Sequence, residues 1–245
     1  MSLAYLRFEL VRTFRNRRFF VFSLAFPIAL YLLIAAPNRN EHDLSGTGLS
    51  APLYFMVGLA VFGTMNAVLS SGARIAAERS VGWNRQLRLT PLSTRNYFRA
   101  KVVTGYAMAL VTIAALYVCG LALGVHMPAG RWFEMTWLML VGLIPLAALG
   151  VLYGHLLTPE SVGPVMGGTT ALLAFLGGSW FPITGNGFIA KLAQDVPSYW
   201  LVQASHAGLG QKHPWSTHGW IVIAAWTVVV TALAARAYRR DTQRV

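Results

Sequence analysis

The residue types that carry out enzymatic chemistry are scarce in this chain, and their spacing does not suit it. A nucleotide-binding loop needs a glycine followed directly by a lysine that reaches the phosphates. The chain has three lysines, Lys101, Lys191 and Lys212, and none follows a glycine. The histidines between positions 206 and 218 are separated by seven and five residues, so no two share a helical face, and interfacial histidines are a better interpretation than a metal site. We therefore expect no catalytic site, no metal and no bound cofactor in this chain.

The polar residues gather instead in one long stretch from Arg74 to Lys101, which holds seven of the twenty basic residues. Gly82 and Thr90-Pro91 would break a helix at either side of a short central piece. Trp83 and Leu87 are four residues apart and would share one face of that piece. Such an element suits contact with a partner outside the membrane. The alternative is a basic loop that orients the protein and meets lipid headgroups.

The elements around this stretch are apolar. Hydrophobic residues make up 56% of the 245 residues and charged residues only 11%, which is typical of an integral membrane protein. The net charge of +12 could indicate nucleic acid binding, but the arginines cluster beside hydrophobic runs, so we expect no nucleic acid partner. The sequence predicts an all-α, polytopic membrane protein that forms one transmembrane domain over residues 1–245. Six transmembrane helices are expected near 19–36, 52–71, 101–124, 134–157, 162–181 and 218–236.

Two further segments are predicted to lie at the membrane surface. Residues 1–18 place leucines and Phe14 on one arc and Glu9 with Arg12 and Arg15 on the other, which is typical of an amphipathic helix lying in the cytoplasmic interface and leading into the first span. Residues 182–217 contain apolar pieces too short to cross, and they predict a helical half-membrane or interfacial excursion before the last span. The stretch 74–100 forms the cytoplasmic segment between the second and third spans.

The distribution of arginine and lysine predicts the orientation. With six spans and both termini in the cytoplasm, sixteen basic residues lie inside and four outside. Such a bias is sufficient to orient a protein in a bacterial cytoplasmic membrane.

Two sets of residues resemble the type-2 ATP-binding-cassette exporter permeases, a family that includes daunorubicin-type drug and antibiotic exporters. The first set runs from Ala77-Glu78-Arg79 through Gly82 and Leu87 to Thr90-Pro91-Leu92-Ser93 and is similar to the cytoplasmic coupling segment of that family. The second set is similar to its external re-entrant signature and comprises Gly177-Gly178-Ser179-Trp180-Phe181-Pro182 and Pro197. A proline that the family often has between those two prolines is replaced here by Gly185-Asn186-Gly187.

The resemblance implies a membrane subunit that exports small amphiphilic compounds, with two copies of a separately encoded ATPase and a second permease, either another copy or a paralogue. ATP and magnesium would be bound by the ATPase. A helix from Glu78 to Arg88 would enter a groove of that partner, with polar contacts from Glu78, Arg79 and Arg88 and apolar anchoring by Trp83 and Leu87. The re-entrant motif would be carried by Gly178, Phe181, Pro182 and Pro197.

The transport pathway would run between two permeases and be lined by the second and fifth spans. The candidate lining residues are Phe55, Met56, Met65 and Asn66, although such residues are also common in ordinary helix packing. Export of a lipid-linked glycan, or a non-transporting sensor or scaffold, remains an alternative function.

Overall fold

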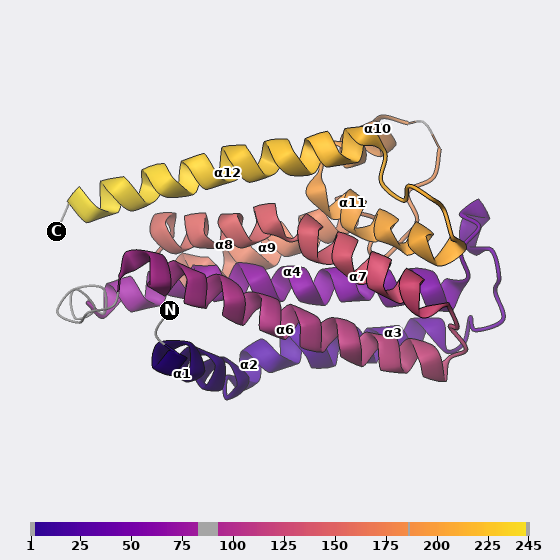
Figure 1. Ribbon diagram of the computed structural model, residues 1–245, viewed down its shortest axis with the longest axis horizontal. Coiled ribbons are helices and arrows are strands. Elements are labelled where there is room, and N and C mark those ends of the chain that lie inside the picture. The colour runs from indigo at the N-terminus through magenta and orange to yellow at the C-terminus, as the bar shows by residue number, and fades with distance from the viewer. Residues whose placement is uncertain (1–2, 83–92, 186, 244–245) are drawn as a thin grey trace.

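The structure is a computed structural model that describes residues 3–82, 93–185 and 187–243. Every regular element in these residues is a helix (Figure 1). The amino-terminal half contains α1 (Leu3–Phe14), α2 (Arg17–Phe20), the π-helical turn η1 (Val21–Ala25), α3 (Phe26–Ala35), the 3₁₀ turn η2 (Leu44–Gly46) and α4 (Ala51–Ser80). The chain continues with α6 (Thr94–Ala122), α7 (Ala129–Gly142), α8 (Ile144–Leu156) and α9 (Pro159–Leu176). The last part contains α10 (Phe188–Gln194), α11 (Pro197–Gln203), the 3₁₀ turn η3 (Ala204–Leu209) and α12 (Thr217–Gln243). The all-α prediction is confirmed for these residues.

Helix α4 lies at the centre of the bundle and packs against α3, α6, α8 and α9. Nearly all of its side chains are buried, because it is surrounded by other helices. Close approach depends on glycine: a Cβ at Gly72 would overlap the backbone of α8 at Gly150, so the two helices touch backbone to backbone. Small residues at such crossings give the dense packing that holds membrane helices together.

Four helical stretches are long and apolar enough to cross a membrane: Ala51–Ser80, Thr94–Ala122, Ala129–Leu156 and Thr217–Asp241. The predicted first span is broken into α2, η1 and α3, with only Val21–Ala35 as a shorter apolar helix. Pro27 lies in the first turn of α3, where its missing donor ends the regular hydrogen-bond ladder of the preceding turn. Likewise Pro145 separates α7 from α8 at Leu143. The predicted fifth span corresponds to the 18-residue α9.

The two ends of the bundle differ in character (Figure 1). The described ends of the chain lie at the same end as the last turns of α4 and the first turns of α6; we call this the connector end. The short helices α10 and α11 lie at the opposite end, here called the hairpin end. Both termini therefore share one end of the bundle, as the predicted topology requires.

The hairpin end contains two short helices, α10 and α11, within residues 182–217, where the chain was expected not to cross the membrane. Helix α9 ends at Gly177, and Gly178 adopts a left-handed φ of 73°, a conformation that favours glycine after a helix. Pro197 begins α11, where its missing backbone donor has no cost.

Candidate functional site

Two adjacent residues at the end of α4, Glu78 and Arg79, reach into two separate groups of side chains. Helix α4 runs without interruption to Ser80, and Gly82 then turns the chain with a φ of 69°. At the other side of the connecting segment, Ser93 caps α6 by accepting a hydrogen bond from the Asn96 amide. The charged groups therefore flank the connecting segment 83–92 directly.

The first group, here called the Glu78 cluster, is buried between α1, α4 and α6. The Lys101 ammonium donates to Glu78 Oε1 at 2.5 Å and to Glu9 Oε2 at 3.0 Å. The Tyr97 hydroxyl donates to the other carboxylate oxygen of Glu78 at 2.5 Å. Arg12 Nη1 also donates to Glu78 Oε1, at 2.7 Å. Removing charges from water is costly, and these multiple contacts offset that cost in the cluster.

The cluster forms because α1 lies along the first turns of α6. The rings of Tyr5 and Tyr97 are 6.3 Å apart, and one turn further along each helix Glu9 meets Lys101. Burial, followed by the nearby carboxylates of Glu9 and Glu78, raises the pKa of Tyr5. The Tyr5 hydroxyl therefore stays protonated and donates to Glu9 Oε1 at 3.1 Å. Buried Glu9 is thus held by both an ammonium and a phenol.

The second group, here called the Arg79 cluster, joins α4 to α8 and α12. Arg79 donates to the carbonyl oxygens of Gly154 and His155 at 3.1 and 2.8 Å, near the end of α8, where the last carbonyls of a helix lack intrahelical partners. Its other terminal nitrogen contacts Asp241 Oδ1 at 2.7 Å. Asp241 Oδ2 lies 3.1 Å from His155 Nδ1, and the rings of Phe98 and Tyr238 pack around His155.

Together the two clusters attach four other helices to the last turn of α4. Glu78 leads to α1 and α6, whereas Arg79 leads to α8 and α12. A displacement of the connecting segment at Gly82 would therefore be resisted by, and passed to, all four helices. The arrangement can transmit movement, and it contains no group placed to do covalent chemistry among the described residues.

The structure places Glu78 and Arg79 differently from the expected helix over 78–88. Both belong to the final turn of α4, so a separate helix does not begin at Glu78. The Glu78 carboxylate is buried and fully engaged within the chain, and Arg79 is engaged at three oxygen atoms. They position the connecting segment and do not present polar groups to a partner in this structure. Trp83, Leu87 and Arg88 lie outside the described residues.

The predicted pathway residues are also placed differently from expectation. Phe55, Met56 and Met65 are buried in the core of the bundle, and Asn66 is half-buried and donates to the Phe62 carbonyl oxygen at 3.2 Å. The reason is the central position of α4, which leaves most of its circumference covered by neighbouring helices. The structure thus does not place these residues on a surface between two permeases.

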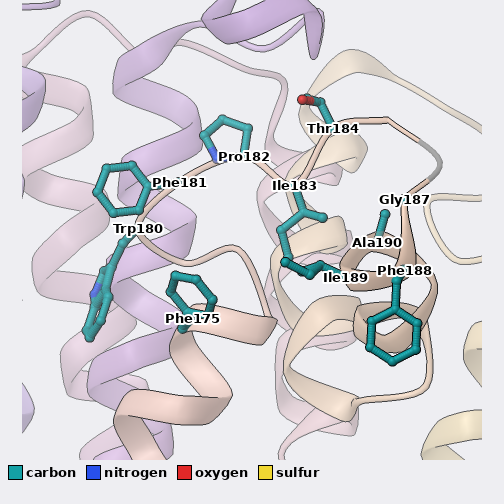
Figure 2. Close-up of a pocket in the computed structure, with 10 residues that line it drawn as sticks. All are labelled: Phe175, Trp180, Phe181, Pro182, Ile183, Thr184, Gly187, Phe188, Ile189 and Ala190. Atoms are coloured by element: carbon teal, nitrogen blue, oxygen red, sulfur yellow. The ribbon is translucent and has the colours of Figure 1, made fainter.

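The residues of the re-entrant motif meet at the hairpin end. The Gly178 carbonyl oxygen accepts a hydrogen bond from the Tyr54 hydroxyl of α4. Phe181 and Pro182 border an apolar groove of about 510 Å³ between the end of α9 and α10. Figure 2 shows Phe175, Trp180 and Phe181 on one side of this groove and Phe188 and Ile189 on the other.

Sequence reasoning missed the other buried members of the Glu78 cluster, above all Glu9 and Lys101. Residues 1–18 were expected to form an amphipathic helix with Glu9 on the same polar side as Arg12 and Arg15. In the structure Arg12 and Arg15 are exposed, but Glu9 is fully buried. A signal was available: Lys101 is one of only three lysines and stands at the start of a long apolar helix, where an acidic partner is expected.

Comparison with known proteins identifies the family of the chain. Residues 38–236 match the profile of a family described as ABC-2 family transporter protein. The chain is also 28% identical over 195 residues to a Bacillus subtilis (strain 168) protein named as a candidate transport permease, YvfS, and the match covers 78% of each chain.

Proposed function

Because the chain belongs to the ABC-2 family of transporter proteins, we propose that it is the membrane-spanning permease of an ATP-driven exporter of small amphiphilic compounds, of the drug or antibiotic class. The observation that carries this proposal is the pair of charged clusters that attach four helices to the last turn of α4, immediately before the connecting segment. A permease without a nucleotide-binding loop of its own needs such a joint to receive movement from a partner.

The partners follow from that need. Two copies of a separately encoded ATPase, which bind ATP and magnesium, would dock on the connecting segments of two permeases, either two copies of this chain or this chain with a paralogue. Trp83 and Leu87 would anchor the segment in a groove of the ATPase, with Arg88 at its edge. An apolar anchor suits a joint that bears force, since buried aromatic residues dominate the energy of protein interfaces.

The membrane setting of the proposal is a bacterial cytoplasmic membrane crossed six times, with the connector end and both termini in the cytoplasm. Four long apolar helices, together with α3 and α9 as shorter passes, are compatible with six crossings. The excess of arginine at the connector end supports the orientation.

The cargo class is supported by the hairpin end. The apolar groove there, about 510 Å³, falls within the usual size range of small-molecule sites. Most of its lining side chains are apolar, and Thr184 contributes a hydroxyl. A small compound with a large apolar part would suit it.

The first test is purification of the tagged protein from its native host, with identification of the proteins that come with it. An ATPase at one copy per permease supports the proposal. A permease that emerges alone, and that none of the stand-alone ATPases of the host binds, contradicts it and favours a sensor or scaffold.

The second test examines the docking role of the connecting segment with Trp83→Ala. Loss of a central aromatic anchor should weaken ATPase binding by about 30-fold, the effect of losing a typical hot spot of about 2 kcal/mol. Trp137→Ala, at an exposed tryptophan of α7, is the matched control and should leave binding unchanged. Equal affinities for both variants would refute the assignment of Trp83.

A further inference from the structure

Helix α1 carries a one-sided surface that the export function does not explain. With Glu9 and Thr13 turned inward, its outward face exposes Phe8, Val11 and Phe14 at 51%, 49% and 42%. The same face exposes Arg7 and Arg12. Arg15, one residue beyond the end of α1, continues this face because its amide still donates to the Val11 carbonyl oxygen, and Arg17 follows on α2. Glu9, the one acidic residue of α1, is buried and already bonded. The exposed charge of this helix is therefore entirely positive.

The arrangement of these side chains selects the kind of partner. At 100° per residue, the exposed arginines and apolar residues of α1 alternate within one arc of about 160°. An acidic protein surface would complement the arginines but would leave the interleaved phenylalanines unmatched. The headgroup region of a membrane complements both, because it offers phosphates beside the ends of the acyl chains. The apolar helix Val21–Ala35 begins a few residues later and holds α1 near that depth.

Arg12 connects this surface to the Glu78 cluster. Its side chain is 42% exposed, and its Nη1 contacts Glu78 Oε1 at 2.7 Å. Glu78 keeps two other partners, Lys101 and Tyr97, each at 2.5 Å, when Arg12 is absent. Arg12 is therefore the member of the cluster that can leave for an external phosphate without orphaning the buried carboxylate.

We propose that α1 is a binding site for anionic phospholipid headgroups, and that Arg12 links lipid occupancy to the connecting segment by exchanging its contact with Glu78 for a lipid phosphate. The binding site stands independently, whereas the effect on coupling rests on the proposed export function. Anionic lipid would loosen the attachment of α1 to the last turn of α4 and so alter transport per ATP hydrolysed.

Lipid binding is tested on the purified permease alone by native mass spectrometry, with phosphatidylglycerol titrated against phosphatidylcholine. We expect the wild type to prefer phosphatidylglycerol, and Arg15→Gln to weaken that binding by about five-fold, the usual contribution of one basic residue at an anionic surface. The triple variant Arg7→Gln, Arg15→Gln, Arg17→Gln should weaken it by about a hundred-fold.

The matched control removes charge elsewhere at the connector end. Arg239→Gln with Arg240→Gln, on the exposed end of α12, should leave phosphatidylglycerol binding at the wild-type level. Inorganic phosphate at millimolar concentration should not displace the lipid, since it offers no apolar contact. Absence of a preference for phosphatidylglycerol, displacement by phosphate, or equal losses in the α1 and α12 variants would overturn the proposed lipid site.

The link through Arg12 is tested in proteoliposomes with the ATPase partner by varying the phosphatidylglycerol fraction. Transport per ATP should depend on that fraction in the wild type and become independent of it in Arg12→Gln, while Arg15→Gln should shift the dependence to higher fractions. Unchanged dependence in Arg12→Gln would refute the link. If no ATPase partner exists, the proposed function fails, and the binding measurements still decide the lipid site.

Discussion

Replacing Lys101 by methionine would remove the central cation of the Glu78 cluster while keeping a side chain of similar length. The ammonium lies 3.0 Å from a Glu9 oxygen and 2.5 Å from a Glu78 oxygen, so these two oxygens are at most 5.5 Å apart. Without the lysine, two carboxylates face each other at that distance. Their repulsion at an effective dielectric constant of about 20 is about 3 kcal/mol or more.

Arg12, which lies 2.7 Å from Glu78 Oε1 and 3.6 Å from Glu9 Oε1, stays in place and relieves part of this repulsion. Proton uptake by one carboxylate relieves the rest. For a glutamic acid of ordinary pKa, about 4.3, protonation costs about 3.7 kcal/mol at pH 7 and about 1.6 kcal/mol at pH 5.5. The folded variant gains a proton that the unfolded chain binds less well, so acidification favours its folded state relative to the wild type. We expect Lys101→Met to be less stable by about 3 kcal/mol at pH 7.5, with the deficit smaller by at least about 1 kcal/mol at pH 5.5.

The assay is equilibrium unfolding in mixed detergent micelles at pH 7.5 and 5.5. Arg99→Met, at an exposed position of the same helix, is the matched control and should change stability by less than about 0.5 kcal/mol. Adding Glu9→Gln to Lys101→Met should restore part of the stability at pH 7.5, since it removes one of the two charges. A deficit that does not depend on pH, or no rescue by Glu9→Gln, would refute the electrostatic reasoning and indicate lost packing instead.

Two further predictions concern the contacts of α4. Gly72→Ala should destabilise the protein by about 1–3 kcal/mol, because its Cβ would overlap the α8 backbone at Gly150. The control Gly130→Ala, with open space around it, should be neutral or slightly stabilising in the same unfolding assay. For the Arg79 cluster, a double-mutant cycle of Arg79→Gln with Asp241→Asn should give a coupling energy of about 1 kcal/mol, as expected for a partly exposed ion pair. Strictly additive effects of the two substitutions would show that α12 is not attached to α4 through this pair.

The local pattern of the chain was sufficient to predict much of the fold. Long apolar runs predicted the helical membrane-type bundle. Gly82 was expected to interrupt a helix, and α4 ends at Ser80, two residues before it. These features depend on a residue and its near neighbours, so composition and spacing are enough to determine them.

The contents of the candidate site depended on which face of each helix turns inward. Helical periodicity shows that Val11 and Phe14 lie opposite Glu9, but lipid and protein interior serve an apolar face equally well, so the hydrophobic pattern does not orient a membrane helix. Only the packing of α1 along α6 decided that Glu9 faces inward to a lysine 92 residues away. The packing of the helices also placed α4 at the centre, where Glu78 contacts Arg12 of α1 and Lys101 of α6. The sequence does not show these pairs, because the pairing of buried charges is a property of the assembled bundle and not of any one segment.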